Sequence, residues 1–288
     1  MNQKKLLSGY GLKYNPFLPD VPTEALLCTR KIESFCWRIE NAHIREGGFA
    51  LITGEPGTGK SALLRILAER LGKIPEVRVV EMEHPQSGVA DFYRELGDAF
   101  NVSLRPHNRW CSFKSLRERY EAHIESTLAR PVLLVDEAQE MHAKVMNELR
   151  ILSSTRFDSR AILTVVLAGD GRLVEKLRRE ELIPLGSRVR TRLVMEPASR
   201  QELLSYLEHL VRTAGNAKLM TRPLMEAVAD HAMGNPRVLC GMAADLLVAG
   251  MEREVDTLDE KLFFELFDPS GTEPVERPKR TARKGRSR

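Results

Sequence analysis

The stretch that decides the fold is Gly54-Glu55-Pro56-Gly57-Thr58-Gly59-Lys60-Ser61, which fits the pattern G-x-x-x-x-G-K-[ST] in full. An apolar run at residues 49–53 predicts a strand before it, and the leucine spacing over residues 61–71 predicts a helix after it. A glycine-rich turn in this position lets backbone amides converge on an anion, and the helix N-terminus adds a favourable dipole. The stretch therefore predicts a phosphate-binding loop.

The side chains of this loop predict ATP with Mg²⁺ as its ligand. Lys60 can neutralise the β- and γ-phosphates, and the Ser61 hydroxyl can bind Mg²⁺. We expect the nucleotide to contact every residue from Gly54 to Ser61, and Ala62 beyond them. The alternative is a glycine-rich turn that carries a lysine by chance, and the flanking strand and helix argue against it.

A second motif places two carboxylates directly after a strand. Val132-Leu133-Leu134-Val135 is an unbroken apolar run, and Asp136 and Glu137 follow it. Ligands of open α/β sheets bind at the carboxyl ends of the strands. We therefore expect Asp136 to help hold Mg²⁺ and Glu137 to polarise the attacking water during hydrolysis. The alternative is a solvated Asp-Glu pair at a strand end.

The order of the predicted elements indicates an α/β domain followed by a helical one. Strands predicted at residues 49–53, 77–82, 131–135, 162–168 and 193–195 alternate with helices, which is typical of a parallel sheet covered on both faces. After Pro197 only helical patterns remain. We expect four parts: an N-terminal extended segment and helix (1–45), a nucleotide-binding domain (46–196), a helical lid (197–266) and a disordered basic tail (267–288).

Composition excludes several classes of protein. The 288 residues are 42% hydrophobic and 29% charged, which is globular composition. The longest nearly apolar run, residues 161–168, is far shorter than the roughly 18–20 residues of a membrane helix. The four cysteines form no C-x-x-C pair, and no secretory signal is visible. We therefore expect a cytoplasmic protein without a membrane partner.

Charge is concentrated at the C-terminus. Residues 277–288 contain seven Lys or Arg and no acid, so with a total of +4 the other residues carry 4 − 7 = −3. Such a run is a candidate arm for nonspecific contact with duplex DNA. The alternative is a solubilising terminus.

Taken together, these motifs resemble the AAA+ family of P-loop ATPases. Shorter matches resemble the ExeA-like group: Gly11-Leu12-Lys13, Asn15-Pro16-Phe17, residues 148–153 and Gly234-Asn235-Pro236-Arg237. That group is similar to regulators of DNA transposition of the TniB, TnsC, IstB and MuB type. The resemblance implies a Mg²⁺-dependent ATPase that forms a homo-oligomer, either a ring or a helical filament. It also implies that Tyr14 and Phe17 pack on adenine, although they could equally form a hydrophobic plug.

The resemblance implies roles for two arginines. Arg188 matches the position of an arginine finger, which reaches the nucleotide of a neighbouring subunit, and Arg190 and Arg192 compete for this role. Arg237 matches a sensor arginine of the lid. It lies in the first turn of a predicted helix, where a cation is unfavourable beside the helix dipole unless an anion is near. One departure is Asp170, which follows the fourth strand where the family has a neutral polar residue. We expect it to point away or to slow hydrolysis.

Three functions follow from the resemblance. The first is an ATPase whose oligomer selects or delivers target DNA to a transposase. The second is an ExeA-like ATPase of protein secretion, a role that in the family goes with a membrane span and a peptidoglycan-binding region, neither of which the sequence shows. The third is an ATP-dependent DNA-binding scaffold with little turnover. We expect the first.

Overall fold

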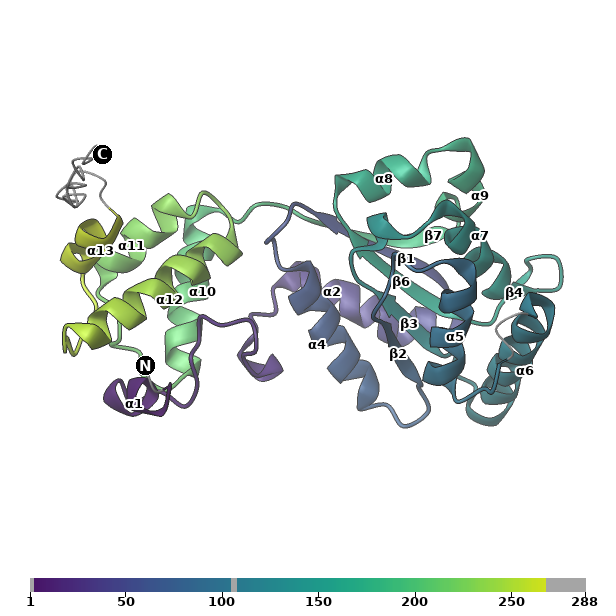
Figure 1. The fold of residues 1–288 in the computed structure, drawn as a ribbon, viewed down its shortest axis with the longest axis horizontal. Helices are drawn as coiled ribbons and strands as arrows, with labels where there is room; N and C mark the ends of the chain where they lie inside the picture. The colour runs from purple at the N-terminus through teal and green to yellow at the C-terminus, as the bar shows by residue number, and fades with distance from the viewer. Residues whose placement is uncertain (1–2, 105–107, 268–288) are drawn as a thin grey trace, which may run out of the picture.

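A five-stranded parallel sheet forms the centre of the molecule (Figure 1). The computed structural model describes residues 3–104 and 108–267. The strands pair in the order β2-β3-β6-β1-β7. Their bounds are β1 (Gly48–Gly54), β2 (Val79–Met82), β3 (Val132–Val135), β6 (Thr164–Gly169) and β7 (Val189–Met195). The predicted parallel sheet is confirmed, and its fifth strand is longer than the three residues expected.

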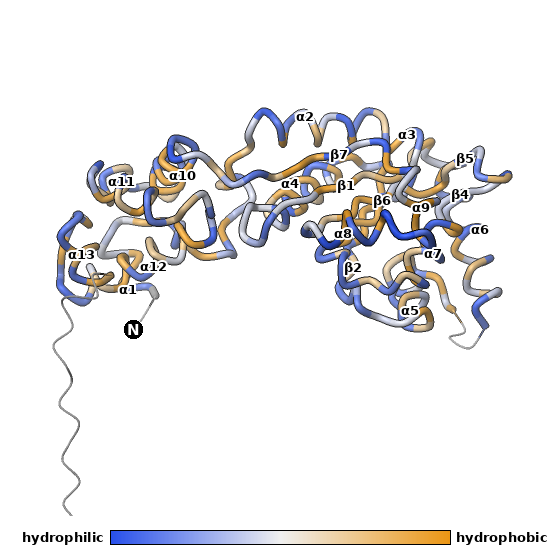
Figure 2. The backbone as a smooth tube through the Cα atoms, turned by 90° about the horizontal axis from the view of Figure 1, so that it is seen from above, coloured by the Kyte–Doolittle hydropathy of each residue, from blue (hydrophilic) through white to orange (hydrophobic). Residues whose placement is uncertain are grey.

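Helices cover both faces of the sheet, because its strands alternate between two hydrophobic cores. In β1, Phe49 and Leu51 face one core, and Ala50 and Ile52 face the other. In Figure 2 the tube of β1 and β6 is largely orange, the colour of hydrophobic residues. The first core is closed by α5 (Val89–Phe100), α6 (Arg109–Thr127), α7 (Ala143–Leu152), α8 (Gly171–Leu177) and α9 (Ile183–Gly186). The second is closed by α2 (Arg30–Arg38), α3 (Ile44–Glu46) and α4 (Lys60–Gly72).

A separate helical lobe follows β7 and lies at the other end of the molecule (Figure 1). It contains α10 (Arg200–Thr213), α11 (Arg222–His231), α12 (Pro236–Glu252) and α13 (Glu260–Phe267). The N-terminal helix α1 (Gln3–Gly9) packs in the same lobe, since Leu6, Tyr10 and Phe17 are buried in its core. Phe17 therefore acts as a hydrophobic plug of the lid, and Tyr14 packs against the same core.

Local sequence signals explain most helix ends. Ser199 and Glu202 form the reciprocal capping box at the start of α10, and Asn235 caps α12. Residues 113–128 have a helical pattern, but the structure starts this helix, α6, earlier than the pattern predicts. Asn108 accepts a hydrogen bond from the Cys111 amide, so the helix begins at Arg109.

The described part of the chain ends with α13, and it contains no helix suited to cross a membrane. Helix α13 extends to Phe267, one residue past the expected end of the lid, and the basic tail lies outside the described residues. In the ranges 3–104 and 108–267, the helices lack the combined length and apolar character that a membrane crossing requires.

Candidate functional site

The phosphate-binding loop connects β1 to α4 and needs glycine at two positions. Gly57 and Gly59 have φ angles of +87° and +99°, which side chains with a Cβ rarely adopt. A Cβ on Gly57 would also lie 2.3 Å from the Asn235 side-chain oxygen. Gly59 caps α4 without a side-chain hydrogen bond, so the first amides of the helix have no acceptor within it. This backbone fits a bound anion.

Lys60 brings a positive charge into the loop. Its side chain is buried, and its Nζ donates to the carbonyl oxygens of Gly54 at 2.8 Å and Glu55 at 3.0 Å. Among the described residues no carboxylate forms an ion pair with it. A buried ammonium held only by neutral carbonyls is suited to an anionic ligand.

The second motif lies at the carboxyl end of β3, next to β6 in the sheet. Asp136 is half-buried and its Oδ1 accepts the Glu137 amide at 2.9 Å. Glu137 adopts a left-handed conformation with φ +47°, which turns the chain sharply and leaves its carboxylate exposed. Asp136 and Glu137 therefore lie in a tight turn after β3 and do not extend the strand.

Gln139 was missed by sequence reasoning, and it holds Glu137 in place. Its side-chain amide donates to the Glu137 carboxylate, and its Oε1 accepts the Asp170 amide at 3.3 Å. The side chain is buried against Gly169, where an added Cβ would lie 2.5 Å from Oε1. Gln139 thus joins the end of β3 to the end of β6. A glutamine two residues after the predicted general base Glu137 is the sequence signal that could have identified it.

Asp170 is already paired within the chain. It caps α8 by accepting the Arg172 amide at 2.9 Å, and its Oδ2 accepts from Arg172 Nε at 2.8 Å. Hydrogen bonding to Arg172 is the main cause that lowers the pKa of Asp170, and Lys60 contributes least. The carboxylate is therefore directed to α8 and neutralised there, so it opposes a phosphate less than an isolated aspartate would.

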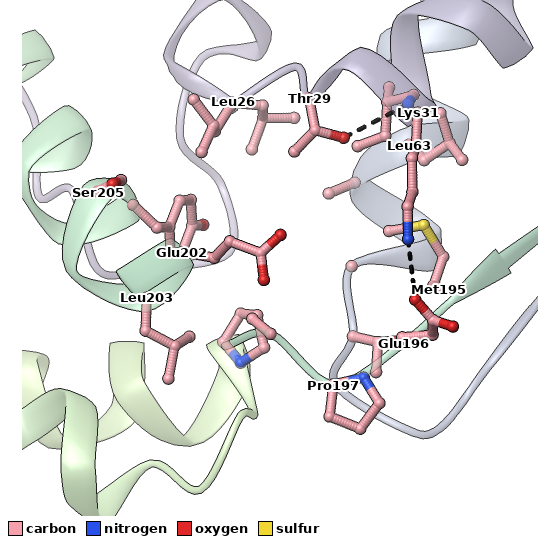
Figure 3. Close-up of a pocket in the computed structure, with 18 of the residues that line it drawn as sticks. Leu26, Thr29, Lys31, Leu63, Met195, Glu196, Pro197, Glu202, Leu203 and Ser205 are labelled. Carbon is pink, nitrogen blue, oxygen red and sulfur yellow. Dashed lines mark hydrogen bonds and ion pairs between the residues drawn. The ribbon is translucent and has the colours of Figure 1, made fainter. Parts of the chain in front are cut away.

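A cavity of about 290 Å³ opens beside the loop (Figure 3). Thr58, Gly59 and Ala62 form its floor, together with the segment before α2, the end of β7, and residues of α10 and α12. Its apolar lining includes Leu26, Ile32, Leu63, Met195 and Leu203. Lys31 and Glu196, both exposed, form an ion pair of 2.8 Å that joins the α2 segment to the linker after β7. The cavity fits a flat apolar ring with polar groups at its edge.

The lid contacts the loop directly through Asn235. Its Nδ2 donates to the Pro56 carbonyl oxygen at 3.1 Å, while its Oδ1 accepts the amides of Arg237 and Val238. Arg237 therefore lies two residues after the side chain that contacts the loop. Its side chain is exposed and makes no hydrogen bond or ion pair with another described residue. The contact between Asn235 and the loop was not predicted from the sequence, where Asn235 was singled out only within the match Gly234-Asn235-Pro236-Arg237.

Arg188 lies at the opposite end of the sheet from the loop. It precedes β7, and Val189 pairs with Phe49 while Met195 pairs with Gly54. Six residues of strand separate these ends, or about 20 Å at the usual rise of a strand. Arg188 forms an ion pair of 2.5 Å with Asp158, and its Nη1 is buried without a partner in the described part of the chain. The competing arginines are also engaged, Arg190 with Glu46 and Arg192 with the Gly186 carbonyl.

Comparisons with known proteins agree with this architecture. Residues 43–177 match the family described as AAA domain. General secretion pathway protein A of Aeromonas hydrophila is 30% identical over 211 residues, which cover 72% of this chain and 38% of that protein. The chain thus spans little more than a third of its curated relative.

Solved structures show the same fold at low identity. Cdc6p from Pyrobaculum aerophilum superposes with a TM-score of 0.68 at 16% identity, covering 84% of this chain and 67% of that one. Domain III of the Thermotoga maritima replication initiation protein DnaA gives 0.60 at 20% identity, covering 87% and 96%. The predicted AAA+ fold is therefore confirmed.

Proposed function

Starting from an AAA domain on an AAA+ fold, in a chain distantly homologous to general secretion pathway protein A, we propose that this protein binds and hydrolyses Mg²⁺-ATP. The observation that carries the proposal is the buried Lys60, which has no ion-pair partner among the described residues and begins α4 next to Thr58, Gly59 and Ala62 of the 290 Å³ cavity. Backbone amides and one ammonium serve phosphates, and the apolar cavity next to them serves a base and ribose. The lid closes the same site through Asn235.

In this proposal each residue of the site has one role in binding or hydrolysing ATP. Lys60 neutralises phosphate charge, and the Ser61 hydroxyl with the Asp136 carboxylate supplies oxygen ligands for Mg²⁺. The bound metal ion would contribute charge neutralisation at the transferred phosphate. Glu137 accepts the proton of the attacking water at its carboxylate. Gln139 restrains that carboxylate through a hydrogen bond, and thereby links its position to the end of β6.

Calorimetric titration tests nucleotide binding. Lys60→Ala should abolish measurable ATP binding, while Lys73→Ala, which breaks an ion pair with Glu69 at the other end of α4, should leave it intact. Unchanged affinity in Lys60→Ala would refute the assignment of the loop. ATPase activity of the unmodified protein, with and without Mg²⁺, tests hydrolysis and the metal separately.

We further propose that the active species is a homo-oligomer with Arg188 acting on the nucleotide of the neighbouring subunit. The separation of about 20 Å along β7 supports this, because Arg188 cannot serve the loop of its own chain without a rearrangement of the sheet. Arg237 supplies the cation from within the same chain, since it follows the residue that contacts the loop. Subunits would therefore hydrolyse ATP only when assembled.

We propose protein secretion as the physiological setting, on the basis of the identity with general secretion pathway protein A. The absence of further regions from this sequence does not count against this setting, because the chain covers 38% of that relative. A chimera tests it: this chain replaces the matching region of the Aeromonas hydrophila protein, and secretion is measured. Secretion should be restored by the chimera and lost in its Lys60→Ala version. A chimera that hydrolyses ATP without restoring secretion would contradict the setting and leave the ATPase intact.

A second candidate is a DNA-associated ATPase that serves a transposase. The seven cations of residues 277–288 favour it, because such a run neutralises phosphates without reading sequence. Deleting residues 277–288 should then flatten the salt dependence of duplex binding by about 3–4 units in log–log slope if about four cations engage. Fluorescence anisotropy across a salt series measures this slope. No binding at low salt with ATP present would remove this candidate.

A further inference from the structure

A second cavity lies far from the nucleotide site and is lined by cationic and polar side chains. It has a volume of about 280 Å³ and is closed by the segment before β2, the C-terminal end of α5 and the middle of α6. We name it the arginine–histidine pocket and define it by the polar residues Arg78, Asn101, Arg119, Tyr120 and His123. Val77 and Pro131, which precede β2 and β3, also line it. It therefore lies at the amino ends of the strands, whereas the phosphate-binding loop follows the carboxyl end of β1.

Two buried polar atoms of the pocket lack a partner in the described residues. The Tyr120 side chain is fully buried and its hydroxyl forms no hydrogen bond. His123 is a half-buried residue, but its Nε2 atom is buried and also has no partner. A buried polar group without a partner costs roughly 1–3 kcal/mol, and such groups are rare in folded proteins. Tyr120 cannot turn away, because its ring is fixed edge-to-face against Phe100 at 4.8 Å. The pocket therefore contains two polar atoms whose hydrogen bonds a ligand could complete.

The charge around these two atoms is positive. Arg119 is exposed at the pocket and makes no hydrogen bond or ion pair with another described residue. Arg78 donates to the Ala99 carbonyl at 2.8 Å, which covers the partial negative charge at the end of α5. Both arginines, after burial, lower the pKa of His123, whereas a contact with the Glu76 carbonyl raises it. The two guanidinium groups can only donate, whereas the Tyr120 hydroxyl and the Asn101 amide can donate or accept, and a neutral imidazole has one accepting nitrogen.

From this arrangement we infer that the arginine–histidine pocket binds a phosphate group. The guanidinium of Arg119 and the hydroxyl of Tyr120 donate to phosphate oxygens, and a P–OH group of hydrogen phosphate can donate to His123 Nε2. The volume of about 280 Å³ leaves room for one phosphate group. This site is independent of the ATPase proposed above.

Thermal unfolding in the presence of inorganic phosphate tests the inference. The experiment uses Lys60→Ala protein so that the phosphate-binding loop does not contribute, and sodium chloride at equal ionic strength as the reference. Phosphate should raise the Tm of Lys60→Ala, and the added substitution Tyr120→Phe should remove most of that increase. Tyr120→Phe deletes one unpartnered hydroxyl, so it should not itself lower the Tm. Arg119→Ala should weaken the apparent phosphate affinity about tenfold or more, and Lys114→Ala, on the same helix outside the pocket, should not.

A parallel arm identifies the source of the phosphate group. Binding of a short duplex DNA is measured by anisotropy in the same variants. If Tyr120→Phe and Arg119→Ala weaken only the binding of inorganic phosphate, the natural ligand is free phosphate. If they weaken the binding of duplex DNA, the ligand is a phosphate of the DNA backbone. If neither ligand responds to Tyr120→Phe or Arg119→Ala, the inference is wrong. Because Lys60→Ala is present throughout, this result stays separable from any failure of the ATPase proposal.

Discussion

Asn235 donates from its Nδ2 to the carbonyl oxygen of Pro56 at 3.1 Å, across 179 residues of sequence. The same side chain accepts the amides of Arg237 and Val238 through its Oδ1 and so begins α12. One residue therefore connects the phosphate-binding loop to the helix that carries the sensor candidate Arg237. Any movement of the lid relative to the loop must break or follow this contact.

Asn235→Asp should separate the two roles of this residue. A carboxylate still accepts the α12 amides, but it places negative charge against the Pro56 carbonyl and beside bound phosphates. We expect lid stability close to that of the unmodified protein and ATP affinity at least tenfold weaker, measured by thermal unfolding and calorimetry. Asn235→Ala loses the cap as well and should cost about 1 kcal/mol of stability. Equal ATP affinity in Asn235→Asp and the unmodified protein would contradict the proposed contact.

Glu137→Gln should keep ATP bound while hydrolysis falls about 10²-fold or more, the usual scale of losing a general base. The amide is nearly the same size and still meets Gln139, so the fold should not change. Glu140→Gln provides the control, because that nearby carboxylate pairs with Arg172 rather than with Gln139. Single-turnover hydrolysis with prebound ATP measures the effect. Normal turnover in Glu137→Gln would exclude the assigned role.

Arg188→Ala should abolish hydrolysis but leave ATP binding intact, because the residue lies about 20 Å from its own loop along β7. Mixing Arg188→Ala with Lys60→Ala subunits should restore part of the activity, at interfaces that join two intact halves. Asp158→Ala is the matched control, since it removes the same ion pair and keeps the arginine. Equal loss of activity in Arg188→Ala and Asp158→Ala would reduce the role of Arg188 to a structural ion pair.

His43 should make stability fall at mildly acid pH. It is buried, its Nε2 is 2.9 Å from the Thr191 hydroxyl, and burial, with Arg190 second, lowers its pKa. In the unfolded chain the His43 imidazole becomes protonated below about pH 6.5, whereas in the folded chain protonation requires a lower pH. The free energy of unfolding should therefore decrease as pH falls below about 6.5. Urea unfolding between pH 7.5 and 5 should show a smaller decrease for His43→Gln than for the exposed His142→Gln. If the free energy of unfolding falls equally with pH in the unmodified protein, His43→Gln and His142→Gln, His43 is not the cause of the decrease.

Local sequence by itself determined the fold class and the phosphate-binding elements. The pattern from Gly54 to Ser61 requires a turn with left-handed glycines and a helix start, and these are local conformations set by neighbouring residues. The apolar runs at β1, β3 and β6 predicted buried parallel strands for the same reason. The caps at Ser199 and Asn235 are also contacts within a few residues.

The tertiary structure alone decided how distant segments complete the sites. Asn235 meets Pro56, Gln139 joins Glu137 to Asp170, and Lys31 meets Glu196 only after the sheet and the lid have packed. Phe17 belongs to the lid core although it lies near the N-terminus. The arginine–histidine pocket joins the segment before β2 to α5 and α6. Periodicity reports which face of an element is buried, but it carries no information on which element packs against that face.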